Sequence, residues 1–506
     1  MTVPTMNSKP NPQAWWTLVA VCLGTFMLLL DVTIVIVALP DIQTSLGAGF
    51  PEVQWTIDAY SLSLAALMLP TGSLADLFGR RRLFATGLVV FTAGSVLCGL
   101  AQSPTMLIAS RAAQGVGGAI MFATSLALLA QTFHGRDRGT AFGVWGAVTG
   151  ISVALGPVLG GLLTSGLGWR WIFLVNLPVG MAAIAITLRH VAESRSERAR
   201  RLDPAGFGVF TFGLLSLIYA LIRASEDGWT NGVVIACFAA ALVLLASFPL
   251  VERLVRAPMF DLSLFRKPTF VGGLIAAFGM NGSLFAMFLF LVIYLQDVLH
   301  YSALETGLRL LVITGATLLA AIPSGRLSAR VPVRLLLGPG LLLVGIGLLL
   351  MRGVDASSDW THLIPGFVVA GLGAGLVNPP LASTAIGVVR PQFAGMASGI
   401  NSTFRQIGIA TSVAALGSIL ATREAGTTGS AHAAAFISGL NELFLISGLI
   451  ALSTGALALL LIRQRDFVTD ALEPVIDANA SPKPAAAGFP TRDGRGQDNA
   501  NEKSAA

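Results

Sequence analysis

The sequence predicts an all-α integral membrane protein that crosses the bilayer about fourteen times. Of its 506 residues, 54% are hydrophobic and 11% are charged, whereas soluble domains carry about 25% charged residues. Apolar runs long enough to span a bilayer core of ~30 Å recur along the whole chain. Arg and Lys gather in the short gaps between alternate runs, which is the distribution that orients membrane helices.

Each predicted span is an apolar run of the length that a bilayer requires. In chain order, the spans cover residues 16–39, 53–75, 83–101, 105–131, 140–164, 171–188, 205–222, 232–250, 269–295, 303–325, 333–351, 362–388, 395–420 and 440–462. A charged connector separates the sixth span from the seventh. The segment after the last span is polar and rich in Ala, Pro and Gly, so we expect a disordered tail.

If successive spans alternate in direction, the basic residues between them fall on one side of the membrane. They are Arg80–Arg82, Arg136, Arg138, the arginines of 189–201, the basic residues of 253–267, those of 326–334, Arg463 and Arg465. The opposite loops, such as 41–52 and 296–302, carry none. We therefore expect both termini in the cytoplasm and, because no cleavable signal precedes it, a retained first span. The excess of Arg over Lys indicates a GC-rich bacterial host, and hence a bacterial cytoplasmic membrane.

Several kinds of chemistry are disfavoured by the composition. The pI of about 9.6 is explained by the loops, so we expect no nucleic-acid partner. None of the four lysines follows a glycine, so the chain has no phosphate-binding loop and we expect neither a cofactor nor an ATPase subunit. The three cysteines lie in apolar spans, which predicts small buried side chains and no metal site. An ion gradient remains as the energy source, and we expect it to be a proton gradient.

Asp31 lies inside the first span, about nine residues before Pro40 and so roughly 13 Å from that end. A carboxylate at this depth is costly to ionise unless it faces a water-filled cavity or a partner. Such a group could take up and release a proton, so we assign Asp31 to proton coupling. The alternative is a carboxylate that a neighbouring helix holds for packing alone.

Arg111 lies about six residues into the fourth span, roughly 9 Å from the same side. This similar depth permits an ion pair with Asp31, in which the guanidinium favours the ionised carboxylate. A conformational change that parts the two would favour protonation, so the site could load on one side and empty on the other. A static pair that only pins the two helices is the alternative.

Candidate substrate residues lie in two spans. Asp58, near the outer end of the second span, is either an acceptor for cations or a water-exposed helix-end residue. The ninth span carries adaptable apolar side chains that could line a greasy substrate site, or could be ordinary packing and lipid-facing surface. The candidates there are Phe278, Met280, Asn281, Phe285, Met287 and Phe288.

An internal repeat links the two ends of the chain. Residues 70–75 (PTGSLA) recur as 323–328 (PSGRLS), and the glycine pair of the fourth span recurs in the twelfth. These glycines are Gly115, Gly117, Gly371 and Gly373. Two similar halves around a central site are typical of secondary transporters. Asp76 and Arg111 have no charged counterpart in the second copy, where Ala329 and Phe367 stand, so we expect the first half to handle protons and the second to contact substrate.

Five stretches resemble known motifs: residues 30–40 (LDVTIVIVALP), 72–82 (GSLADLFGRRR), 111–117 (RAAQGVG), 156–161 (GPVLGG) and 169–178 (WRWIFLVNLP). Together they are similar to the motifs of the major facilitator superfamily, and within it of drug:proton antiporter family 2, the multidrug exporters with fourteen helices. The resemblance runs from about Trp15 to Arg465. One position departs from it, because Ile36 stands where the family has Asn.

The resemblance implies a major facilitator fold with two six-helix bundles, residues 15–190 and 269–463. Two extra helices would lie in the basic connector 191–268, and the tails would be 1–14 and 464–506. It also implies conformational roles for three motifs. The loop of residues 72–82 would act as a latch, residues 111–117 would lie in the proton-coupling helix, and residues 156–161 would form a stripe of small residues with a proline kink. The residues concerned are Gly72, Asp76, Gly79, Arg80, Gly115, Gly156, Pro157, Gly160 and Gly161.

The predicted function is secondary active efflux of hydrophobic, cationic or amphipathic drugs or antibiotics in exchange for protons, and not enzyme catalysis. The expected partners are these small substrates, protons and the lipid bilayer. The alternatives are a proton-coupled carrier of one metabolite and a membrane sensor without flux. Two polar positions have no role in this scheme. Glu305 completes a helix capping box with Ser302, so we interpret it as structural. Arg405 lies inside a span, which indicates a functional role, but the sequence identifies no partner for it.

Overall fold

The computed structural model describes residues 12–133, 135–195, 203–255, 262–328, 330–355, 358–390, 393–424 and 430–467. These ranges are helical and contain no strand, as predicted. Most of the predicted tails lies outside them, as do Ala329 and two parts of the connector, residues 196–202 and 256–261.

The first half of the chain contains α1 (Pro12–Leu46), α2 (Phe50–Phe78), α3 (Arg80–Gly99), α4 (Pro104–Thr132), α5 (Gly135–Leu167), α6 (Trp171–Leu174) and α7 (Asn176–His190). Their main contacts join α4 to α2 and α3, and α1 to α5 and α7. Local chemistry sets the boundaries. Gly79 adopts a φ of +106° where α2 gives way to α3, and Ser103 caps α4 by accepting a hydrogen bond from the Met106 N–H.

The second half contains α10 (Pro268–Met280), η2 (Asn281–Phe285), α11 (Ala286–Ile293), η3 (Tyr294–Val298), α12 (Ala303–Leu327), α13 (Arg334–Leu350), η4 (Trp360–Leu363), α14 (Ile364–Gly387), α15 (Ala394–Glu424) and α16 (Ser430–Leu461). A short 3₁₀ segment on each side completes it, η1 (Leu262–Arg266) and η6 (Gln464–Asp466). The predicted capping box is present, since Ser302 and Glu305 bond reciprocally at the start of α12. The ninth predicted span is not a uniform α-helix, because η2 and η3 are π-helical.

Each of the fourteen predicted spans corresponds to a helical stretch, but 12 or 13 of these stretches have the length and composition of a membrane span. Within the described residues, 12 helical stretches are long and apolar enough to cross a membrane, and α5 makes 13 if its two parts, bent by 42°, are taken as one span. The remaining predicted span is α13, which is apolar but has only 17 residues. The largest boundary error is at α16, which begins at Ser430 and not at Leu440, and α1 also continues to Leu46, beyond its predicted end at residue 39.

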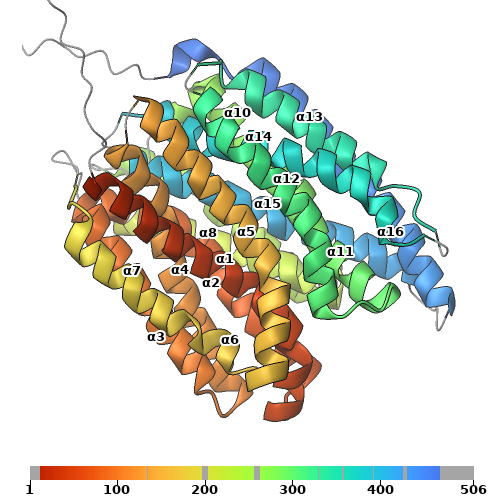
Figure 1. Cartoon of the computed structure of the whole chain (residues 1–506). Helices are drawn as coiled ribbons and strands as arrows, with labels where there is room; N and C mark the ends of the chain where they lie inside the picture. The colour runs from red at the N-terminus through yellow and green to blue at the C-terminus, as the bar shows by residue number, and fades with distance from the viewer. Residues whose placement is uncertain are drawn as a thin grey trace, which may run out of the picture. The chain divides into compact units, whose positions relative to one another are not determined.

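The two halves meet mainly along two helix pairs, α5 with α12 and α2 with α15. Figure 1 shows the first of these pairs, with α5 beside α12. Both pairs approach closely through glycines of the repeated motif. A Cβ on Gly72 would lie 2.4 Å from the Gly395 carbonyl oxygen, and one on Gly325 would lie 2.1 Å from that of Gly139. The sequence repeat is therefore also a repeat of contacts between the halves.

The inserted helices are α8 (Pro204–Asp227) and α9 (Gly232–Leu254). The first contacts both α2 and α15, whereas α9 contacts chiefly α8. Long apolar side chains of α9 are exposed, including Leu242 at 71% and Leu254 at 75%.

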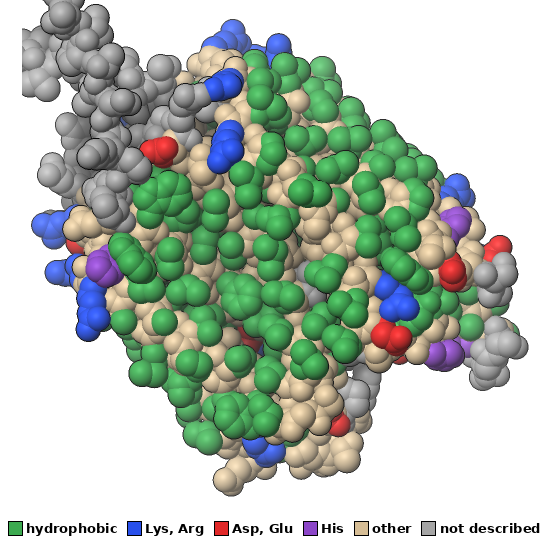
Figure 2. All heavy atoms as spheres, viewed as in Figure 1, with side chains coloured by type: hydrophobic (Ala, Val, Ile, Leu, Met, Phe, Trp, Pro, Cys, Tyr) green, Lys and Arg blue, Asp and Glu red, His purple; other side chains and the backbone are tan. Residues whose placement is uncertain are grey.

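Figure 2 shows that apolar side chains dominate one face of the molecule, with Lys and Arg at its margins. This surface suits contact with lipid acyl chains.

Candidate functional site

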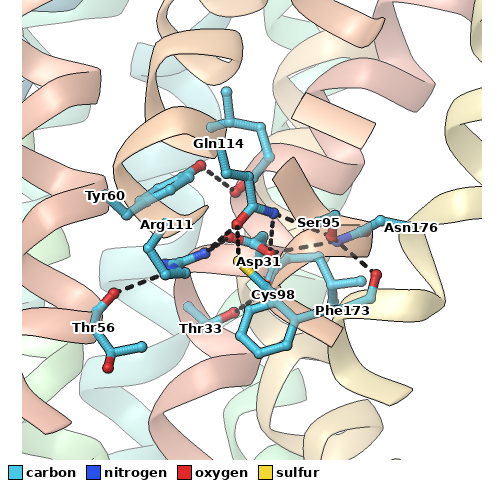
Figure 3. Close-up of polar contacts among 12 residues, drawn as sticks. Asp31, Thr33, Thr56, Tyr60, Ser95, Cys98, Arg111, Gln114, Phe173 and Asn176 are labelled. Carbon is cyan, nitrogen blue, oxygen red and sulfur yellow. Dashed lines mark hydrogen bonds and ion pairs between the residues drawn. The ribbon is translucent and has the colours of Figure 1, made fainter. Parts of the chain in front are cut away.

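Asp31 lies on α1 in the middle of the first half and is fully buried. Three side chains from two other helices donate hydrogen bonds to its carboxylate (Figure 3). Arg111 Nη1 contacts Oδ2, while Gln114 Nε2 and Asn176 Nδ2 reach Oδ1 at 2.8 and 3.3 Å. Because every partner is a donor, this arrangement stabilises the ionised carboxylate.

Arg111, on α4, is also buried, with 1% of its surface exposed. Besides its ion pair with Asp31, its guanidinium donates to Gln114 Oε1 at 2.8 Å and to the Thr56 carbonyl at 3.0 Å. It also lies 4.1 Å from the centroid of the Tyr60 ring. The predicted pairing of α1 and α4 is thus present, and both charges are compensated inside the bundle.

Three residues of this network were not predicted: Ser95, Gln114 and Asn176. Ser95 accepts hydrogen bonds from the side-chain amides of Asn176 at 2.9 Å and Gln114 at 3.2 Å, and donates to the Phe173 carbonyl at 2.9 Å. Gln114 had a usable signal, since it lies three residues after Arg111 on the same helix face. Asn176 also had one, since it lies in the motif of residues 169–178, whereas Ser95 had none that separates it from other buried polar residues.

The loop motif forms a second polar cluster, at the arginine-rich end of α2. Asp76 accepts from Arg80 at 2.7 and 3.1 Å, and from the backbone N–H groups of Gly395 at 3.1 Å and Met396 at 3.0 Å. Arg80 also donates to Gln131 Oε1 at 2.8 Å. Asp76 thus caps the beginning of α15 and ties the first half of the chain to the second.

The small-residue stripe of α5 packs against α1 beside Asp31. A Cβ on Gly156 would lie 1.8 Å from Thr33 Oγ1, and one on Gly160 would lie 2.9 Å from the Ile34 carbonyl oxygen. The bend of 42° separates residues 137–153 from 155–167, next to Pro157, which leaves the carbonyl one turn earlier without its usual donor. Gly161, which follows Gly160, is half-buried. The stripe therefore supports the turn of α1 that carries the buried acid.

The helix 4 glycines have the close contacts that their motif suggests. A Cβ on Gly115 would lie 2.1 Å from Ser63 Oγ on α2. A Cβ on the equivalent Gly371 would lie 2.3 Å from the Ile313 carbonyl oxygen of α12. Asp58 is half-buried in the third turn of α2.

The predicted substrate residues divide into two groups. Phe285 and Phe288 line a cavity of about 20 Å³ between α5, α12 and α14, a volume that holds one or two water molecules. Its polar lining includes Thr314, Thr317 and Asn378. The other members do not line this cavity: Met280 and Met287 are buried in the hydrophobic core, Asn281 bonds to the Ala277 carbonyl, and the backbone of Phe278 packs against Gly408.

Comparison with known proteins gives consistent results. The family model of the Major Facilitator Superfamily matches residues 21–413. The chain is similar to the multidrug resistance protein Stp of Mycobacterium tuberculosis, with 39% identity over 80% of this chain and 75% of that protein. It is also similar to the puromycin resistance protein pur8 of Streptomyces alboniger, with 36% identity over 81% of this chain and 82% of that one.

A solved structure shares the fold. The human organic anion transporter MFSD10 (TETRAN) superposes with a TM-score of 0.62, covering 88% of this chain and 100% of that one, at 16% identity. At this identity the similarity concerns the fold alone.

Proposed function

The chain belongs to the major facilitator superfamily, and on that premise we propose that it exports small hydrophobic, drug-like compounds in exchange for protons. Relatives with 34–39% identity are named as resistance or export proteins for several antibiotics, which supports efflux as the activity. The observation that carries the proton coupling is the buried Asp31–Arg111 pair. A membrane interior offers few other reasons to keep an acid at that depth.

The proposed cycle uses the geometry of this pair. While Arg111, Gln114 and Asn176 donate to Asp31, the ionised acid is favoured. Movement of α1 relative to α4 would withdraw the guanidinium, after which the isolated acid takes up a proton. The glycine stripe of α5 is the element that transmits a movement between the halves to α1, because α5 also packs along α12.

The energetics suffice without ATP. One proton charge moving through 100 mV releases ~2.3 kcal/mol, and one pH unit adds about 1.4 kcal/mol. Their sum supports a substrate gradient of roughly a few hundredfold. We further propose that the arginine-rich side faces the cytoplasm, so the Asp76 contact with α15 closes that side in this conformation.

Proteoliposomes with an imposed pH gradient test the proposal. Addition of ethidium, a neutral hydrophobic dye or an anionic one should release protons from the wild-type carrier, and a protonophore should abolish substrate accumulation. A carrier of one metabolite would ignore all three dyes, and a sensor would show no substrate-dependent proton movement. Either result would refute drug:proton exchange.

A further inference from the structure

Arg405 is a buried cation that the proton-coupling network does not use. It lies in the middle of α15, with 5% of its surface exposed. Its Nε and Nη2 atoms are buried and have no hydrogen-bond partner among the described residues. A guanidinium stays charged under all ordinary conditions, so the protein keeps a positive charge in its interior without a carboxylate from the described part of the chain.

The same face of α15 carries further polar groups that lack protein partners. Ser398, Asn401 and Ser402 precede Arg405 by seven, four and three residues, which places all four on one side of the helix. The three are fully buried, and neither hydroxyl nor either atom of the Asn401 amide has a hydrogen-bond partner among the described residues. Buried polar groups of native proteins are normally paired, so this strip of donors and acceptors indicates a ligand or solvent site.

The strip faces the first half of the protein. The Arg405 guanidinium carbon lies 6.0 Å from the centroid of the Trp145 ring on α5. The next residue of α5, Gly146, lies against Asn378 of α14, whose Oδ1 also lacks a partner among the described residues and which lines the small cavity. The arginine thus lies where helices of both halves meet, beside an aromatic ring of the first half.

We propose that Arg405 and Asn401 bind an anionic oxygen group, a carboxylate or phenolate, of an aromatic substrate. The planar guanidinium fork matches two carboxylate oxygens, and a charge-assisted bond in a dry site is strong. The same charge repels a cation. This inference rests on the proposed efflux function, and it adds aromatic organic acids to the substrates that the carrier exports.

Three probes with one ring system separate charge from hydrophobicity: 2-naphthoate, its neutral methyl ester and 2-naphthylmethylammonium. Binding to the purified full-length protein is measured by calorimetry at pH 7.5, with no proton gradient. The wild type should bind naphthoate about tenfold more tightly than the ester or the ammonium, the worth of one charge-assisted hydrogen bond. Arg405→Gln should remove this preference, and Arg405→Lys, which keeps the charge but not the fork, should retain part of it.

Arg423→Gln is the matched control, because Arg423 lies on the same helix but is exposed and paired with Glu442 at 3.0 Å. It should leave the preference unchanged. Melting temperature distinguishes binding from a structural role: Arg405→Gln should melt no lower than the wild type without ligand, since it removes an unpaired buried charge. Naphthoate should then raise the melting temperature of the wild type and not that of the variant.

Equal affinities of the wild type for the three probes would overturn the inference, and would mean that the arginine is only solvated. So would a preference for the ammonium, or a loss in Arg405→Gln that is the same for all three. These outcomes leave the proposed function intact, because ethidium-dependent proton release is measured separately. Conversely, selective naphthoate binding by a protein that moves no protons would refute the exchange and keep the site.

Discussion

At the residue scale, the proposed coupling depends on the donors around one buried acid. Asp31 is paired with Arg111, so neither charge can be removed alone without leaving the other in the interior. The amides of Gln114 and Asn176 fix the carboxylate from the opposite side. The network therefore holds the Asp31 carboxylate in one position in this conformation.

Asp31→Asn should abolish proton-driven efflux and destabilise the protein by about 3–5 kcal/mol, because the Arg111 charge stays buried without its partner. The double variant Asp31→Asn/Arg111→Gln should recover most of that stability while efflux remains absent. The measurements are dye efflux in energised vesicles and thermal unfolding in detergent. Normal coupling in either variant would exclude Asp31 as the proton site.

A pH effect is expected where the end of α16 meets the start of α10. Hydrogen bonds from the hydroxyl of Thr269 at 2.7 Å and from its backbone N–H lower the pKa of Asp466 below its ordinary value of 3.8. The stabilisation is therefore complete above about pH 5 and is lost as the pH falls through the lowered pKa. The melting temperature should fall more steeply between pH 5 and 3 for the wild type than for Thr269→Val; parallel curves would contradict the assignment.

At the element scale, glycines decide which helices approach each other. The α5 stripe touches α1 through Gly156 and Gly160, while Gly139 of the same helix touches Gly325 of α12. One helix thus contacts both the proton-site helix and the second half. The bend next to Pro157 lies between these contacts, so the two parts of α5 need not move together.

Gly156→Ala should separate α5 from α1, since the new Cβ would lie 1.8 Å from Thr33 Oγ1. Overpacking of this kind costs typically 1–3 kcal/mol, and we expect efflux to fall at least about tenfold as Asp31 shifts. Gly166→Ala is the matched control on the same helix, because a Cβ there meets no atom within 4 Å. Equal effects of the two substitutions would show that the close contact has no special role.

At the scale of the whole molecule, two similar glycine contacts join the halves, and one of the two has a carboxylate in addition. The α2–α15 and α5–α12 pairs both use glycine contacts, but only the first has the carboxylate of Asp76 capping the partner helix. The polar interior is unequal as well. Asp31 and Arg111 pair within the first half, whereas Arg405 of the second has no carboxylate partner among the described residues.

Asp76→Asn should weaken the closure of the arginine-rich side, because an amide group would face the Gly395 and Met396 donors and Arg80. Opening of this side can be measured with a cysteine placed at position 69 in a variant that lacks the native cysteines. Leu69 is 2% exposed and packs against Gly399 of α15, so the cysteine is accessible only when α2 and α15 separate. Its labelling by a membrane-impermeant maleimide should rise about tenfold in inside-out vesicles.

Asp227→Asn is the control for this measurement. Asp227 also pairs with an arginine four residues away, Arg223, but near the surface and at the end of α8. Its replacement should leave the labelling rate unchanged. Unchanged labelling in Asp76→Asn would refute the closing role of the motif.

The sequence by itself determined the features that depend on distance along one chain segment. Apolar run lengths predicted the helices, the arginines predicted a common side, and helix rise placed Asp31 and Arg111 at similar depths. Only the tertiary structure decided which segments meet. The α15 partners of Asp76 lie more than three hundred residues away. The π-helical turns interrupt the ninth span, and the Trp145 ring near Arg405 belongs to α5. The periodicity of apolar residues predicts which face of a single helix is buried. Which two helix faces pack together depends on side-chain shapes, and a one-dimensional pattern does not record these shapes.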